Sequence, residues 1–516
     1  RPEHEQLPAI CAIGCRNRYD ECSNMSEVFI SRDAAMGDLL AAAAYIGERT
    51  SSADGRAEAM NAIVPAYLER GEVDLAAELA NGVDDPFSRD KLLTLVAEKC
   101  ARLDDDEYAL QLADAIEESA MREDSLERIA LIKAAAGQRE TASEIAAQLG
   151  HRDGVDAALA VKLAETDIDA ALADINLIEF ATARVSALRS IAESQPHHAV
   201  KCLEIALGDT NEIEHDEERI RYFCDIGNSF VAAKRNDLAI KAFDTAFQQT
   251  KELDNIHRDF FFSNCALGFL HSNSQDLAEK ALDEIRDKTQ MASSLVGFAR
   301  ESWKKDEKET ALEDLEEAFE ILKSQREIET RDTRAKNGLM AAIAAQFAGF
   351  GKHERGLDAA AEVTDPNEKA SAISQIAQVL VLQNEDDLAR EVLDVFEEPS
   401  GRVAALLAMS DVKRDKAIRE DAVALIDQAV AQTDEVPQHV LRSELLNGAA
   451  GRYAVFGEEA KARETTLTNL DLIAQVRDES ARATLVAAIA PIFSENNYQI
   501  GDAEKDAITR MIGGRF

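Results

Sequence analysis

The sequence is poor in the residues that interrupt helices and in large aromatic side chains. Of its 516 residues only 9 are proline, aromatic residues make up 5%, and one residue is tryptophan. Hydrophobic residues nevertheless make up 46% of the chain, which is enough for a core. With abundant alanine, leucine and glutamate, this composition is typical of a helical protein.

Basic residues are also scarce relative to acidic ones. The chain has 57 Lys and Arg against 98 Asp and Glu, which gives a formal net charge of −41. Binding to duplex nucleic acid needs a cationic surface, so the sequence argues against nucleic acid as a primary partner. An acidic surface favours partners rich in Lys and Arg, and it also keeps a long chain in solution, which is the plainer interpretation.

No apolar run reaches the roughly 18 residues that span a bilayer, so membrane insertion is not expected. The apolar stretch LLAAAAYIG at 39–47 is too short. The cysteines number seven, and Cys100, Cys202, Cys224 and Cys265 are scattered, which is typical of reduced thiols in a cytoplasmic protein. Because the chain begins at Arg1 without an initiator methionine, export and a removed upstream effector segment both stay open.

Catalytic signatures are missing too. The sequence contains no Walker A motif, no GxGxxG, no HExxH and no GxSxG, so we expect a non-enzymatic protein without a cofactor. Cys11, Cys15 and Cys22 lie close together near His4, but they lack the second ligand pair of a structural zinc site. We interpret them as packed thiols of a capping helix, with zinc binding and a redox contact as the alternatives.

What the sequence does contain is a repeat. A pair of residues resembling Ile-Ala recurs thirteen times, most often at intervals of 33 to 35, and we call the first residue of each pair the marker. A period near 34 is typical of arrays of two-helix units. The markers are Ile63, Val96, Ile129, Leu163, Ile191, Ile226, Cys265, Phe298, Ile343, Ile376, Met409, Ala449 and Ile489.

Other positions keep the same register. The residue three before the marker is always apolar, which gives the first helix of each unit (helix A) a buried face. In the ten full-length units, the residue thirteen after the marker is Ala or Gly, small enough to let the second helix (helix B) approach. Eight residues after the marker stands Gly, Asp or Asn, which predicts a turn, except at Lys234 and Ala417.

These positions resemble the tetratricopeptide repeat (TPR) family, best at 225–247 and 62–80, although its early Trp and closing Pro are absent. The resemblance implies an all-α fold, a right-handed α-solenoid of about twelve to thirteen units. HEAT-type repeats are the alternative. We expect an N-terminal helical cap at 1–55, repeats at 56–150, two short irregular units at 151–210, repeats at 211–505 and a C-terminal cap or tail at 506–516.

A basic residue stands seven positions before the marker in eleven units, a series that we call the basic ladder. A cation in the first turn of a helix opposes the helix dipole, so another interaction must offset it. We expect each cation to pair with an acidic side chain or a carbonyl of the preceding unit, and the alternative is a groove that binds an acidic peptide or another anion. The ladder is Arg56, Arg89, Arg122, Arg184, Arg219, Arg258, Lys336, Lys369, Arg402, Arg442 and Arg482.

Taken together, these patterns predict a scaffold or adaptor that binds a protein or peptide on the concave face lined by the A helices. Three or four adjacent units would form the site, and the acidic charge favours a basic partner. The alternative is the sensor or regulatory region of a larger signalling protein. No catalytic, metal-binding or cofactor-binding residue is predicted.

Overall fold

The computed structural model describes residues 29–325 and 332–513. These residues form 28 α-helices and two short 3₁₀ helices, η1 (Thr210–Glu212) and η3 (Thr433–Glu435), and the described part of the chain contains no strand. None of the described helices is long and apolar enough to cross a membrane. The predicted all-α array of two-helix units is confirmed.

Each unit is an antiparallel pair of helices. The A helices are α3 (Ala53–Arg70), α5 (Pro86–Arg102), α7 (Ser119–Ala135), α9 (Asp153–Ala164), α11 (Ala181–Ser194), α13 (Asp216–Ala232), α15 (Arg258–His271), α17 (Lys288–Lys304), α19 (Thr333–Gly349), α21 (Pro366–Leu382), α23 (Pro399–Asp415), α25 (His439–Val455) and α27 (Glu479–Glu495).

The B helices alternate with them along the chain. They are α4 (Val73–Asn81), α6 (Asp106–Asp114), α8 (Arg139–Ala146), α10 (Ile168–Ile175), α12 (Ala199–Asp209), α14 (Asn236–Glu252), α16 (Gln275–Leu282), α18 (Lys308–Ser324), α20 (His353–Ala361), α22 (Asp386–Leu393), α24 (Arg419–Gln432) and α26 (Glu459–Ile473). Three further helices, α1 (Arg32–Gly37), α2 (Leu39–Glu48) and α28 (Asp502–Gly513), lie outside this alternation.

The turn between the two helices of a unit has the same backbone in eleven units. All residues with a positive φ in the described chain stand eight positions after a marker, and only the units of Leu163 and Ile191 lack one. Lys234 and Ala417, which do not look like turn residues, adopt φ values of 59° and 60° at this position. The fold therefore imposes the left-handed conformation even where the side chain does not favour it.

Small residues let the A helices approach the neighbouring helix B closely. The ring of Phe243 on α14 packs against Gly227 on α13 and Gly268 on α15. A Cβ atom would lie 2.7 Å from this ring at Gly227 and 2.3 Å from it at Gly268, so no other residue fits without a shift. Gly227, the second residue of its marker pair, and Gly268, three residues after the next marker, thus permit close packing between consecutive units.

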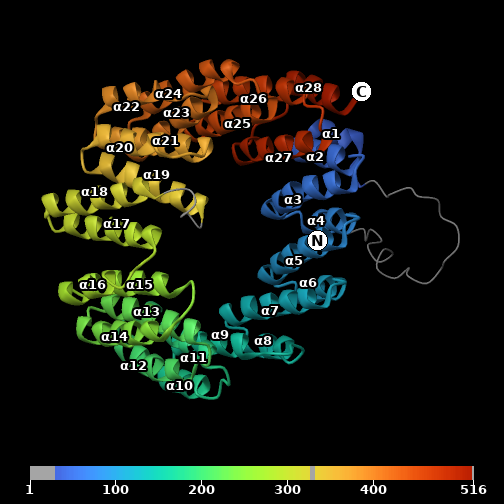
Figure 1. Ribbon diagram of the computed structural model, residues 1–516. Helices are drawn as coiled ribbons and strands as arrows, with labels where there is room; N and C mark the ends of the chain where they lie inside the picture. The colour runs from blue at the N-terminus through green and yellow to red at the C-terminus, as the bar shows by residue number, and fades with distance from the viewer. Residues whose placement is uncertain (1–28, 326–331, 514–516) are drawn as a thin grey trace.

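The array closes into a ring. Figure 1 shows the helices arranged around an open centre, with the A helices on the inner side and α27 and α28 next to α1, α2 and α3. Helix α27 packs against α3 as neighbouring A helices do elsewhere, and α2 packs along α27 in the place of a helix B. Leu40 and Ile489, from opposite ends of the array, belong to one apolar cluster. A segment that the sequence analysis places in an N-terminal cap thus completes the thirteenth unit.

Candidate functional site

The A and B helices carry very different charges. The thirteen A helices hold 27 basic and 23 acidic side chains, whereas the twelve B helices hold 12 basic and 33 acidic ones. Since the A helices lie on the inner side of the ring, the acidic surplus lies on the outside. We call the inward-facing surface of the A helices the inner wall. The A helices themselves therefore carry nearly balanced charge.

The basic ladder holds together the loops that connect successive units. Arg184 donates to the carbonyl oxygens of Ile178 and Glu179, both at 3.0 Å, in the loop before its own helix. It also pairs with Asp209, at 3.1 Å, and with Glu212, which lie at the end of the next helix B. One side chain thus ties both loops to the start of helix A, and it is only 10% exposed.

Other ladder residues repeat this arrangement in part. Arg56 donates to the Thr50 carbonyl oxygen at 2.7 Å and pairs with Asp84, and Lys369 pairs with Glu397 at 2.9 Å. The acidic partners mostly come about 28 residues later, from the following loop, and not from the preceding unit as expected. The reason is geometric, because the chain returns to the same end of the stack after each helix pair. The remaining contacts join Arg219 to Ile213 and Gln249, Arg258 to Glu284, Lys336 to Gln325, Arg402 to Glu435, Arg442 to Asp434 and Arg482 to Met511.

Arg122 differs from the other ladder residues. In the part of the chain that the structure describes, its side chain makes no hydrogen bond or ion pair. Arg56 and Arg89 each pair with an acidic residue 28 positions later, whereas the residue 28 positions after Arg122 is Gly150. Arg122 is therefore the ladder residue with the least structural role.

A second series, which the sequence analysis missed, stands one residue after the ladder. Asp90, 1% exposed, accepts hydrogen bonds from the backbone N–H groups of Glu117 and Glu118, both at 3.0 Å, and pairs with Arg89. Asp259 does the same for Arg286 and Asp287, at 2.9 and 2.6 Å. Charged acceptors for backbone N–H groups fix the following loop strongly. The signal was present as basic–acidic pairs at 89–90, 122–123 and 258–259.

Two lysines are buried between units, also unpredicted. Lys133 has a fully buried side chain and pairs with Asp104, at 3.0 Å, and Asp106. Lys413, 5% exposed, pairs with Asp386 at 2.7 Å. Both lysines stand four residues after the marker of their own unit. Asp106 and Asp386 both stand ten residues after the marker of the preceding unit, so the same ion pair forms at two places in the array. Most other units carry an apolar residue at this position, so a lysine there was a sign in the sequence of a buried cation.

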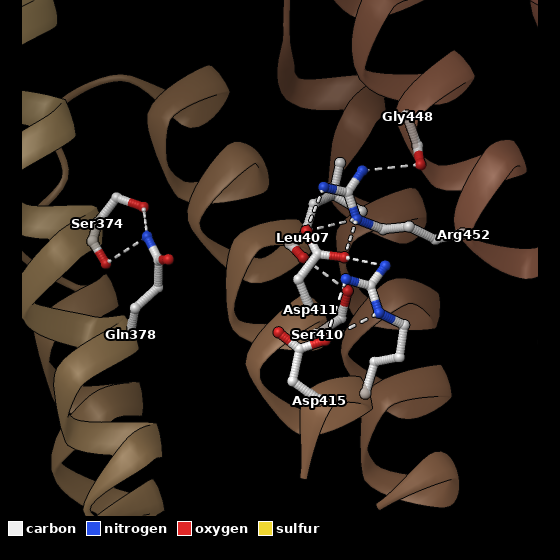
Figure 2. A network of polar contacts seen from close by, with 9 residues as sticks. Ser374, Gln378, Leu407, Ser410, Asp411, Asp415, Gly448 and Arg452 are labelled. Atoms are coloured by element: carbon white, nitrogen blue, oxygen red, sulfur yellow. Dashed lines mark hydrogen bonds and ion pairs between the residues drawn. The ribbon is translucent and has the colours of Figure 1, made fainter. Parts of the chain in front are cut away.

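Polar contacts also join neighbouring A helices along the inner wall. Figure 2 shows Arg452 on α25 against Asp411 on α23, with Nη2 and Oδ2 2.6 Å apart, while its Nη1 donates to the Gly448 carbonyl oxygen at 2.9 Å. Arg300 on α17 donates to Gln346 on α19 at 2.7 Å, at the same register. At these two places, polar side chains thus tie neighbouring A helices together.

A cavity of about 740 Å³ opens between α11, α12 and α13, within the short unit of Ile191. Its lining combines the charged residues Arg189, Glu193, Asp225 and Lys234 with apolar residues that include Leu203. A cavity of this size falls in the range of small-molecule sites, roughly 300–1,000 Å³.

The cysteines of the described chain are not placed for chemistry. Cys100, Cys202, Cys224 and Cys265 are buried, and burial raises the pKa of the Cys100 thiol to about 11, so it stays protonated near neutral pH. The cluster of Cys11, Cys15 and Cys22, with His4, lies outside the described residues. Within residues 29–325 and 332–513, no three His, Cys, Asp or Glu side chains are grouped for a metal ion.

The comparisons with known proteins add little. No family model and no curated protein matches the chain. Among solved structures, it is similar to Ton1535 from Thermococcus onnurineus NA1, at 16% identity over 67% of this chain and 97% of that one, with a TM-score of 0.25. It is also similar to the APC/C hetero-tetramer Cut9–Hcn1, at 12% identity over 93% and 92% (TM-score 0.21), and to Naa15/Naa10 bound to HypK-THB, at 13% over 92% and 86% (TM-score 0.24). The repeat architecture is established by the helices of this chain themselves.

Proposed function

We propose that this protein is a non-enzymatic scaffold or adaptor, a divergent TPR-like array that binds a protein or peptide on its inner wall. The observation that carries the proposal is the ring of thirteen A helices, whose inner side surrounds an open centre.

The charge distribution decides which partner suits which surface. An inner wall with 27 basic and 23 acidic side chains on its helices fits an extended peptide of mixed or slightly negative charge. A basic partner, which the net charge of −41 favours, would instead meet the B helices on the outside. The two surfaces can therefore be tested separately.

The test is a pull-down with the full chain and two variants of matched charge change. R300E/K304E alters the inner end of α17, and E140K/E144K alters the outside of α8, so both pairs lie on exposed helical surface. We expect the first variant to lose the partners that the wild-type protein captures and the second to keep them. The opposite result would show that binding takes place on the outer surface.

For the basic ladder we propose a structural role, because its residues contact loops on both sides of helix A. Replacing Arg89 by Ala would leave the buried Asp90 without its cation. We expect R89A to lower the free energy of unfolding by about 1–3 kcal/mol, and R122A, whose side chain has no partner in the described chain, to leave it nearly unchanged. Equal stability of both variants, with weaker partner binding, would favour an anion-binding ladder.

A sensor or regulatory region is the second candidate function. It is favoured by the cavity in the short unit, because a pocket of about 740 Å³ has the size of a small-molecule site.

A further inference from the structure

The cavity exists because one helix is short. Helix α11 has 14 residues, whereas its neighbour α13 has 17, and no residue with a positive φ follows α11. The chain instead turns through Gln195–His198 and enters α12 early. The last turn that a full-length helix A would supply is therefore missing, and the space opens against α12 and the end of α13.

The floor of this cavity is apolar. Leu203 and Ala199 on α12 and Ala192 on α11 are buried residues of its lining, and Val200 beside them is half-buried. None of these side chains carries a group that could form a hydrogen bond. The floor thus suits the hydrocarbon part of a small ligand.

The rim carries two cations and two carboxylates. Arg189 donates from Nη1 to Asp225 at 3.1 Å, and with 32% of its side chain exposed its guanidinium group keeps further N–H donors open to solvent. Glu193 follows one helical turn after Arg189, and Lys234 comes from the end of α13. Neither Glu193 nor Lys234 forms an ion pair with another described residue. The rim therefore offers an unused donor, an unused cation and an unused carboxylate.

These groups match a particular kind of molecule. A free α-amino acid carries a carboxylate, an ammonium group and a side chain on one carbon atom, and it is a zwitterion at neutral pH. A guanidinium group that keeps N–H donors open to solvent can bind the carboxylate of such a ligand. The net charge of the four rim residues is zero, so a zwitterion fits better than a net anion.

We propose that this cavity binds an apolar α-amino acid. The carboxylate accepts hydrogen bonds from the exposed part of the Arg189 guanidinium group and from the Lys234 ammonium group, the amino group pairs with Glu193, and the side chain lies on the floor formed by Leu203, Ala199 and Val200. This site goes beyond the proposed scaffold and lies apart from the α17 surface on which that function is tested. It would supply the input of a sensor.

The test uses L-leucine, L-methionine and L-phenylalanine as probes with the full-length protein. Titration calorimetry is expected to show saturable binding of at least one of them, together with a higher melting temperature. N-acetyl-L-leucine and L-leucinamide, which lack the ammonium charge and the carboxylate respectively, should each bind at least tenfold more weakly than L-leucine if L-leucine is the ligand, and the corresponding derivatives serve for the other probes.

Variants separate this site from general effects. R189Q and E193Q should each weaken the binding of the amino acid at least tenfold, and V200W should block it by filling the cavity. R300Q, an inner-wall arginine of a regular unit, is the matched control and should bind normally. The proposal is overturned if no probe binds the wild-type protein, or if R189Q, V200W and R300Q all bind alike. The pull-down with R300E/K304E tests the scaffold function separately, so its outcome does not depend on whether the cavity binds an amino acid.

Discussion

Two joints between neighbouring units of the ring are held by different kinds of contact. Between α5 and α7 the chain is continuous, and the joint holds the buried Lys133 with Asp104 and Asp106. Between α27 and α2 the chain is not continuous, and the joint is almost wholly apolar, with Leu39, Leu40 and four alanines of α2 buried. Polar ties are few here, such as Ser51 N–H to Glu479 at 3.0 Å and the Ser480 hydroxyl to Glu58 at 2.9 Å.

The difference shows what each joint needs. A continuous chain fixes the register of neighbouring units, so a buried ion pair there can form with little entropic cost. The closing joint must find its own register across more than 400 residues. The buried leucines and alanines of α2 supply an apolar surface that packs along α27, and Gly47 lets α2 also approach α3, where an added Cβ atom would lie only 3.0 Å from Ile63.

The closing joint should be the most sensitive part of the ring to a buried charge. Leu40 is fully buried, and in L40D a carboxylate would replace it at an apolar contact. We expect a loss of about 3–5 kcal/mol from the joint, with opening of the ring seen as a larger radius of gyration in X-ray scattering. L177D is the control, because Leu177 is 84% exposed. An unchanged radius for L40D would mean that α2 does not hold the ring closed.

A disulfide across the closing joint should connect its two sides covalently, as the continuous chain connects neighbouring units elsewhere. A Cβ atom at Gly55 would lie 3.5 Å from that of Ser480, which is within the range of a disulfide. The oxidised G55C/S480C variant should gain about 2–4 kcal/mol against unfolding, although the Ser52 hydroxyl must move aside. Comparing the oxidised and reduced forms by denaturation isolates the link, and the native cysteines Cys11, Cys15 and Cys22 are first changed to Ser. A bond that fails to form would contradict the closed ring.

Variants at Lys133, between α5 and α7, test how much the buried ion pairs contribute to stability. K133A leaves Asp104 and Asp106 without their cation and should cost about 1–3 kcal/mol, reduced because Asp104 is 70% exposed. K133M should cost less, since apolar residues such as Phe230 and Leu380 fill the same position elsewhere. Urea denaturation measures both. If K133M is as destabilised as K133A, the charge itself is required at this joint.

The smallest expected effect concerns the turn. Ala417 adopts a φ of 60° at a position where four units carry glycine. A417G should therefore raise the free energy of unfolding by about 0.5–1 kcal/mol, because it removes the left-handed strain of an L-residue. G457A, the reverse change at the equivalent turn, should lower it by a similar amount. Thermal unfolding of the two variants gives the comparison.

The regular part of this fold could be predicted from the sequence, because each unit repeats the same local signals. The marker pair, the small residue of helix B and the turn position all describe contacts within a unit or between consecutive units. Ring closure is different, since it depends on the summed rotation of thirteen units, and no residue of LLAAAAYIG indicates that α2 packs on α27.

For the basic ladder, the sequence identified the residues but not the groups that they contact. It located the ladder residues such as Arg184, but the direction of their contacts follows from how the loops stack. The outward placement of the acidic surplus was within reach, because the helices marked by the small residue hold 33 acidic and only 12 basic side chains. The cavity beside Arg189 could not be foreseen, since it arises from a missing helical turn.

The closing joint has a consequence for synthesis on the ribosome. Helix α2 ends at residue 48 and its partner α27 ends at residue 495, so α2 emerges long before the surface that covers it. At roughly 5–20 residues per second, this interval is about 20–90 seconds. Throughout it, an alanine- and leucine-rich surface stays uncovered, which makes the nascent chain a natural client for a chaperone until the thirteenth unit is made.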